Sequence, residues 1–278
     1  MKTNPLTVID YLKNAVTPTW LKRIEYGIKY NLPIGVDLNK TDYEALTCAY
    51  YDLEGTGKSS GDNDHNNGDE TKGASKIKPK NCKCGQVCHY FQESCKCGST
   101  EFIYSDTENS TDSRWGIDTA AHFRYKVPNY HMWILEAEKY EAKNKTFLLK
   151  LYSISSENEA FNEILKIQNE SKSKHKNFLP YSKDFYASNP KYMACFKITL
   201  GDIEQEVNIT SEETQEIVLT KKILTQSRGI KKYLPKTFVL NKDTYHYEEI
   251  KPLLNIRNHK TSHGKQRGET KRRFEQNN

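Results

Sequence analysis

The chain has 278 residues, of which 36% are hydrophobic and 28% charged, and its formal net charge is +6. Its mean hydropathy is −0.85, and no stretch approaches the roughly 18 apolar residues of a membrane span, which argues against a membrane-spanning protein. Seven cysteines, an odd number, do not fit a disulfide framework. The first residues, MKTNPLTVIDYLKNAV, lack an apolar signal block, so we expect a cytoplasmic protein with one large or two small domains.

Residues 1 to 54 are predicted to be mostly helical. The stretch LTVIDYLKNAV spaces Leu6, Ile9 and Leu12 close to a helical stripe. A second stretch, TDYEALTCAYYDLEG, starts with a capping residue and stops at Gly55.

Residues 55 to 80 are rich in Gly, Ser, Asn, Asp and Lys, which predicts a flexible linker. The linker contains GKS at 57 to 59, as at the end of a phosphate-binding loop. That loop needs a glycine five positions before Gly57, where this chain has Asp52. We therefore reject a phosphate-binding loop here.

Residues 81 to 100 are predicted to form a small cysteine-rich zinc module. The five candidate ligands for Zn²⁺ are Cys82, Cys84, Cys88, Cys95 and Cys97. Structural zinc is tetrahedral, so four of these cysteines, or three with His89, would satisfy it. Redox-active or disordered thiols are the alternative, whereas Cys48 and Cys195 are expected to be ordinary buried residues.

Residues 101 to 205 are predicted to form a sheet domain. Apolar runs of strand length occur in WGIDTAAHF, HMWILEAEKY, TFLLKLYSI and PKYMACFKITL, with a helix expected in SSENEAFNEILKIQNES. Residues 206 to 256 are expected to be helical, with one helix from Ser211 to Gly229. The predicted fold class is α+β, or α/β, with a central mixed sheet flanked by helices.

Three carboxylates stand beside these apolar runs. If Pro128 and Asn129 form a turn between two antiparallel strands, Asp118 lies opposite Glu136 and Glu138. Carboxylates this close repel each other, and Mg²⁺ would relieve that repulsion. Alternatively, the acids are ordinary edge charges paired with nearby lysines, for which the candidates are Lys139, Lys143 and Lys145.

This stretch, GID followed about 18 residues later by ILEAEK, resembles the active-site hairpin of PD-(D/E)XK nucleases, which include many type II restriction endonucleases. In that pattern, an Asp on one strand is followed by Glu-x-Lys on the next. The resemblance implies that Asp118 and Glu136 bind Mg²⁺ and that Glu138 occupies the third position. It implies Mg²⁺-dependent cleavage of double-stranded DNA by a homodimer.

A weaker resemblance is to RNase H-like insertion-sequence transposases. It would use Asp106 or Asp112, then Asp184, and a late Glu248 or Glu249. A non-enzymatic zinc-braced nucleic-acid-binding protein is a third alternative.

The C-terminal residues 257 to 278 are predicted to be a basic tail that contacts DNA phosphates. From 257 to 273, seven basic residues face one acid, an excess equal to the net charge of +6. The basic residues are Arg257, Lys260, Lys265, Arg267, Lys271, Arg272 and Arg273.

Overall fold

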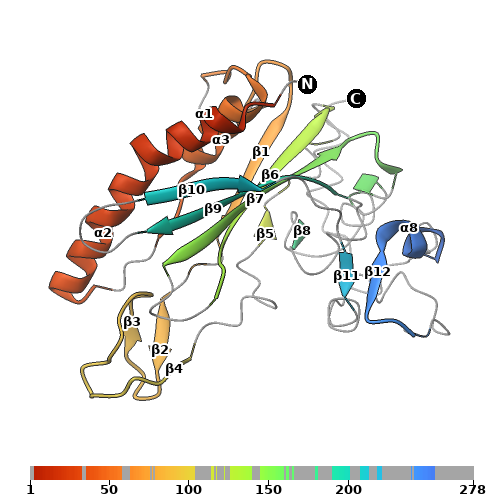
Figure 1. Cartoon of the computed structure of the whole chain (residues 1–278). Helices are drawn as coiled ribbons and strands as arrows, with labels where there is room; N and C mark the ends of the chain where they lie inside the picture. The colour runs from red at the N-terminus through yellow and green to blue at the C-terminus, as the bar shows by residue number, and fades with distance from the viewer. Residues whose placement is uncertain are drawn as a thin grey trace, which may run out of the picture.

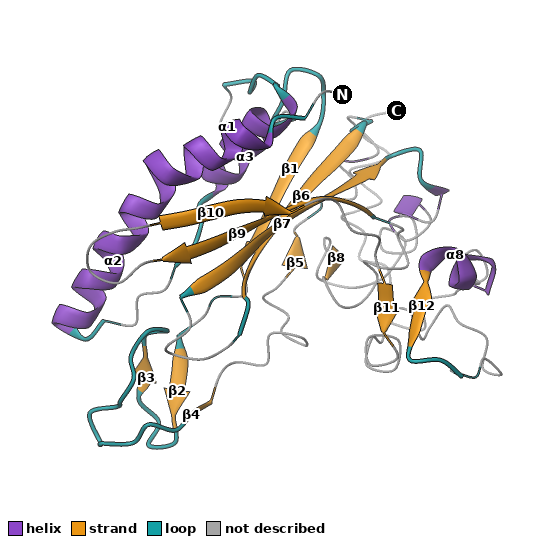
Figure 2. Cartoon of the chain, in the orientation of Figure 1, coloured by secondary structure: helices purple, strands orange, loops and turns teal. Residues whose placement is uncertain are grey.

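The structure is a computed structural model of the whole chain. It describes residues 3–32, 36–57, 63–75, 77, 79–103, 114–115, 117, 122, 126–139, 145–159, 161–162, 165, 179–180, 190–200, 207–212, 218–220, 239 and 241–253. Figures 1 and 2 show helices along one side of a twisted sheet, with a small strand cluster beside it.

The N-terminal part is helical, as the sequence predicts. Helix α1 (Pro5–Tyr11) continues through a π-helical turn, η1 (Leu12–Val16), into α2 (Thr17–Tyr30). Helix α3 (Lys40–Tyr51) follows, and Asn39 caps it by accepting from the Asp42 backbone N–H. Asp42 in turn accepts from the Asn39 N–H, which completes a capping box.

The main sheet has five strands in the order β1-β6-β7-β9-β10. The pair β1 and β6 is parallel, while β7 and β9 pair antiparallel with their neighbours, so the sheet is mixed. This arrangement confirms the predicted α+β class with a mixed sheet. The strands are β1 (Glu70–Ser75), β6 (Asn129–Ala137), β7 (Thr146–Ser155), β9 (Lys191–Leu200) and β10 (Val207–Glu212).

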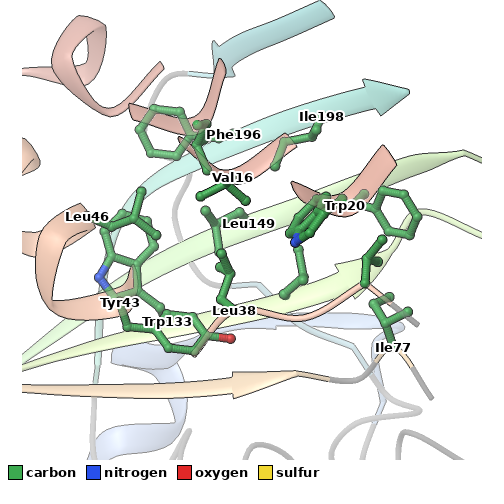
Figure 3. Packing of buried hydrophobic residues seen from close by; sticks show 14 of the residues in the cluster. Val16, Trp20, Leu38, Tyr43, Leu46, Ile77, Trp133, Leu149, Phe196 and Ile198 are labelled. Atoms are coloured by element: carbon green, nitrogen blue, oxygen red, sulfur yellow. The ribbon is translucent and has the colours of Figure 1, made fainter. Parts of the chain in front are cut away.

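One face of this sheet packs against α1, α2 and α3, and Figure 3 shows the packing. On this face, strand side chains such as Trp133, Leu149 and Phe196 are fully buried in the core that the sheet shares with the helices. Helix α3 lies directly on β1, because a Cβ at Gly73 would come within 1.9 Å of the Tyr43 ring. A larger residue at position 73 would therefore separate the helix from the strand.

The opposite face of the sheet is buried as well. Tyr130 of β6 contacts the Phe161 ring at a centroid distance of 5.6 Å, and His122 contacts the same ring at 5.9 Å. His122 also hydrogen-bonds the Tyr130 hydroxyl at 3.1 Å. Burial on both faces explains why β6 is almost continuously apolar.

Smaller elements surround the main sheet. They are β2 (Lys80–Cys82), β3 (Val87–Cys88), β4 (Phe102–Ile103), β5 (Arg114–Trp115), β8 (Leu179–Pro180), β11 (Val218–Thr220), β12 (Thr244–His246), helix α8 (Tyr247–Ile250) and the 3₁₀ turn η3 (Lys251–Leu253). The three strands β3-β2-β4 form the cysteine-rich module. Across the described ranges, no helix combines the length and apolar character needed to cross a membrane.

Two predicted regions differ from the structure. Residues 63 to 75 of the predicted linker are ordered, and Glu70–Ser75 forms the edge strand β1 of the main sheet. In the predicted helical part from 206 to 256, the described residues include strands β10, β11 and β12, and α8 has only four residues. The β-branched residues of Val207–Glu212 favour the strand pairing with β9 over a helix. The predicted basic tail from 257 lies outside the described residues.

Candidate functional site

Two turns with the same sequence, Cys-Lys-Cys-Gly, form the cysteine site. In the first, the Gly85 N–H donates to the Cys82 carbonyl at 2.9 Å, and in the second the Gly98 N–H donates to the Cys95 carbonyl at 2.8 Å. Both glycines have φ close to +88°, a conformation that suits glycine. The two turns therefore present their thiols with the same backbone geometry.

Four sulfur atoms converge between the two turns. Cys82 Sγ lies 3.5 Å from Cys97 Sγ, and Cys84 Sγ lies 3.6 Å from Cys95 Sγ. All four lie within 4.8 Å of one another. Thiolates bound tetrahedrally at about 2.3 Å from zinc stand about 3.8 Å apart. The four cysteines are thus placed to bind one metal ion.

The thiols influence each other's ionisation. Backbone hydrogen bonding lowers the pKa of Cys82 to about 7, with help from the neighbouring thiols. For Cys84, a backbone hydrogen bond lowers the pKa. The hydrogen bonds with the neighbouring thiols raise it by more, and the pKa is about 12. One thiolate is therefore favoured and further ionisation is opposed, a conflict that a bound cation would remove.

Cys88 and His89, also considered as ligands, lie outside this group. The Cys88 thiol is directed to the Gln86 carbonyl at 3.9 Å. His89 Nδ1 accepts from the Phe91 N–H at 3.1 Å, and burial lowers the pKa of its imidazole to about 4. The expectation that all five cysteines are candidate ligands is corrected to four.

The module is attached to the main core by the loop between the two turns. Tyr90 and Phe91 each place a ring 6.0 Å from that of Phe147 on β7. The Tyr90 hydroxyl donates to the Lys139 carbonyl at 2.9 Å. Phe147 also contacts Trp20 of α2 at 6.0 Å, so the module is joined to the same core as the helices.

The described residues do not show the predicted carboxylate hairpin. Strand β6 pairs in parallel with β1 on one edge, and the antiparallel partner that the structure describes for it is β7. Asp118 itself lies outside the described residues. Glu136 forms an ion pair with Lys150 on β7, and Glu138 forms one with Lys197 on β9 at 2.7 Å. These two acids are thus compensated by lysines of neighbouring strands.

A different group of acids lies at the start of β1. Glu44 of α3 and Asp64 both contact the ammonium of Lys40, at 3.1 and 3.2 Å. The Asp64 side chain is only 5% exposed. Glu70 forms an ion pair with Lys72 on the same strand. The group therefore contains three carboxylates and two ammonium groups.

Hydrogen bonds to the backbone hold this group together. Asp64 Oδ2 accepts from the Thr71 N–H at 2.9 Å, and Glu70 Oε2 accepts from the Asp64 N–H at 3.3 Å. Burial raises the pKa of Glu44; Lys40 opposes this shift and the nearby Asp64 adds to it. The charge of Asp64 thus makes ionisation of Glu44 less favourable, an effect that a bound cation would offset.

Asp64, Glu70 and Lys72 lie in the part of the sequence that is predicted to be a linker. The sequence signal for this group is DHNNGDETK, where an Asp precedes Glu-x-Lys, and Glu-x-Lys begins the short strand ETKGAS. The strand is hard to predict because the stretch has the composition of a loop and because Ala74 is the one buried hydrophobic residue of β1.

The remaining predicted residues have mixed outcomes. The tail residues 257 to 273 and the transposase acids Asp106, Asp112 and Asp184 lie outside the described residues. Glu249 forms an ion pair with Lys242.

Comparison of the chain with known proteins found no matching family model, no similar curated protein and no similar solved structure.

Proposed function

We propose that this protein is a metal-dependent endonuclease that cleaves double-stranded DNA, in the manner of a type II restriction enzyme. The observation that supports it best is the group at the start of β1, where Asp64 precedes Glu70-Thr71-Lys72. This order matches the Asp, then Glu-x-Lys, of the PD-(D/E)XK pattern, including the lysine that the 118–138 stretch lacks. The proposal therefore places the catalytic acids at Asp64 and Glu70.

This group supplies carboxylate oxygens, the kind of donor that a hard divalent cation such as Mg²⁺ prefers. Mg²⁺ is held in proteins by one or two carboxylates, with water and phosphate oxygens completing its shell. When bound, it would activate a water molecule and neutralise charge on the phosphate.

The protein's own cations have separate roles in this proposal. Lys40 lies between Glu44 and Asp64, where its ammonium neutralises both carboxylates. Its side chain is 62% exposed, so it can move away when a stronger cation arrives. Lys72 keeps a positive charge beside Glu70, where it would attract the scissile phosphate.

The cysteine site is proposed to hold a structural Zn²⁺, with Cys82, Cys84, Cys95 and Cys97 as ligands. A closed set of four thiolates is typical of structural zinc, since catalytic zinc keeps an open position. A zinc-braced nucleic-acid-binding protein without catalysis remains the second candidate, because this site does not depend on the carboxylates.

Digestion of plasmid DNA tests the proposed function. The zinc-loaded protein is incubated with plasmid in Mg²⁺ or in Ca²⁺, and the ends of the products are sequenced. We expect double-strand cuts at one short sequence in Mg²⁺ and binding without cutting in Ca²⁺. Binding in both ions without any cleavage would favour the non-enzymatic candidate.

A homodimer and the basic tail complete the proposal. Two sites related by a two-fold axis would cut the two strands.

Deleting residues 257 to 278 should weaken binding to all DNA sequences alike, because the tail would contact phosphates. Each lost phosphate contact should reduce the slope of log K against log salt by about 0.9. Titration of labelled DNA at several salt concentrations measures this slope, and an unchanged slope would remove the tail from the interface.

A further inference from the structure

In the segment from 64 to 72, each residue of the proposed catalytic group is next in sequence to a buried polar residue. Asp64, Glu70 and Lys72 belong to that group. Between them stand His65, Asp69 and Thr71, which are 1%, 0% and 4% exposed. Burying polar groups is unfavourable unless they are hydrogen-bonded, so their partners are informative.

His65 and Thr71 form a chain of hydrogen bonds that ends on helix α3. The Thr47 hydroxyl donates to the Tyr43 carbonyl at 3.1 Å, and the Thr71 hydroxyl donates to Thr47 at 2.8 Å. Thr71 can therefore only accept from His65 Nε2, which lies 2.7 Å away. Trp133 of β6 donates to the same Thr47 hydroxyl at 2.8 Å. His65 Nε2 must therefore carry a hydrogen, so the hydrogen bonds fix the protonation of this ring nitrogen.

Asp69 forms a second set of bonds, which ends on strand β6. Its carboxylate accepts from His131 Nε2 at 2.9 Å, from Asn129 at 2.9 Å and from Asn67 at 2.8 Å. Burial alone would raise the pKa of Asp69, but these donors outweigh it and the pKa is lowered. The ring of His131 lies 4.4 Å from that of Tyr51 at the end of α3.

We propose that His65, Asp69 and His131 are positioning residues that hold Asp64 and Glu70 in the geometry for metal binding. The inference rests on the proposed function. His65 is the next residue after Asp64, and Asp69 the one before Glu70, so fixing the buried side chains also fixes the backbone of the two acids. His131 acts from β6, where it pairs with Thr71, and its side chain reaches the segment through the hydrogen bond to Asp69 and a ring contact with His65 at 6.3 Å.

His131 is the best residue for a test, since it lies outside the 64–72 segment. His131→Phe keeps a ring beside Tyr51 but removes the donor to Asp69. We expect the cleavage rate at saturating DNA to fall about 10- to 100-fold, as for partners that orient metal ligands, with DNA affinity unchanged. His131→Gln, which retains a donor, should recover part of the rate.

His122→Phe is the matched control. His122 is another buried histidine with hydrogen bonds, at 3.1 Å to both Tyr130 and Asn162, and it lies on the opposite face of the sheet. Its loss should lower stability to a similar degree and leave cleavage within a few-fold of wild type. Equal losses of cleavage in the two variants would mean that His131 is only structural.

Two measurements without DNA cleavage separate this inference from the proposed function. Hydrogen exchange of residues 63 to 72 should be faster in His131→Phe than in His122→Phe, and Mn²⁺ should bind about 10-fold or more weakly. If the wild-type protein does not cleave DNA, the function fails but these two results still decide the positioning role. Identical exchange and Mn²⁺ affinity in both variants would overturn it, and so would a wild-type protein that binds no Mn²⁺.

Discussion

Asp64→Asn should reduce the rate of Mg²⁺-dependent DNA cleavage by about a thousandfold. A bound metal contributes several kcal/mol to stabilising the charge of the transition state, and each loss of about 1.4 kcal/mol lowers a rate tenfold. The asparagine side chain can still accept from the Thr71 N–H, which Asp64 does now at 2.9 Å. The fold of the segment should therefore survive, and the loss should lie in cleavage rather than in DNA binding.

Glu136→Gln is the control that separates the two candidate positions of the active site. Glu136 is also a largely buried carboxylate in an ion pair, here with Lys150. Single-turnover cleavage and DNA binding in Ca²⁺ are measured for both variants. If Glu136→Gln abolishes cleavage and Asp64→Asn leaves it within a few-fold of wild type, the catalytic acids lie in the 118–138 stretch after all.

The strands of the sheet could be predicted from the sequence because their apolar runs are long. β9 falls within a stretch predicted as a strand, and β6 and β7 overlap most of theirs, with β6 starting two residues earlier and β7 ending one residue later. Their pairing was harder to predict. The turn was placed at Pro128 and Asn129, but Asn129 begins β6, and the hairpin turn lies between Ala137 and Thr146. The Glu138 N–H donates to the Thr146 carbonyl at 3.0 Å and closes that turn. The misplaced turn led to the prediction of an antiparallel partner for β6 other than β7.

Strand β1 was missed for a different physical reason. Hydrophobic patterning detects strands that are held by apolar burial, whereas β1 is held by polar contacts. Its Thr71 is buried in the hydrogen-bond chain to Thr47, and its Gly73 allows Tyr43 to lie directly on the strand. Such contacts come from residues 24 or more positions away, so no local window of sequence contains them. The proposed catalytic group was missed together with the strand that carries it.

The expected helix from Ser211 to Gly229 shows how local signals can be overridden. A capping serine followed by acids is typical of a helix start. In the structure, Ser211 and Glu212 instead end strand β10, where they pair with Phe196 and Cys195 of β9. The edge of an existing sheet offered this segment backbone hydrogen bonds, and tertiary context outweighed the local preference.

The cysteine-rich module combines a correct prediction of its place with a correction of its candidate ligands. The density of cysteines indicates a candidate metal site at 82 to 97, but five thiols for four positions leave the choice open. The choice follows from the repeated Cys-Lys-Cys-Gly turn, whose two copies each supply two ligands. Cys88 lies between the copies and belongs to neither.

Cys97→Ser should remove most of the zinc and unfold the module, whereas Cys88→Ala should retain about one zinc per chain. The module has almost no core of its own: its buried cluster is Cys82, Cys88 and Cys95, with Phe102 packed against them. A structural zinc site supplies about 10 kcal/mol or more of folding free energy, which so small a cluster cannot replace. Metal analysis of the two purified variants measures the zinc directly.

The effect of zinc loss should reach the main core through Tyr90 and Phe91. Tyr90 and Phe91 lie between the two Cys-Lys-Cys-Gly turns and pack on Phe147. Without zinc, hydrogen exchange should increase strongly over residues 80 to 103 and moderately at Phe147, while β9 and β10 keep their protection. Removing large buried aromatic contacts costs about 3 to 5 kcal/mol, a large part of a typical stability of roughly 5 to 15 kcal/mol. We therefore expect a clearly lower melting temperature for Cys97→Ser.

If Cys97→Ser keeps its zinc and its melting temperature while Cys88→Ala loses both, Cys88 is the ligand, and the pairing of the two turns is wrong.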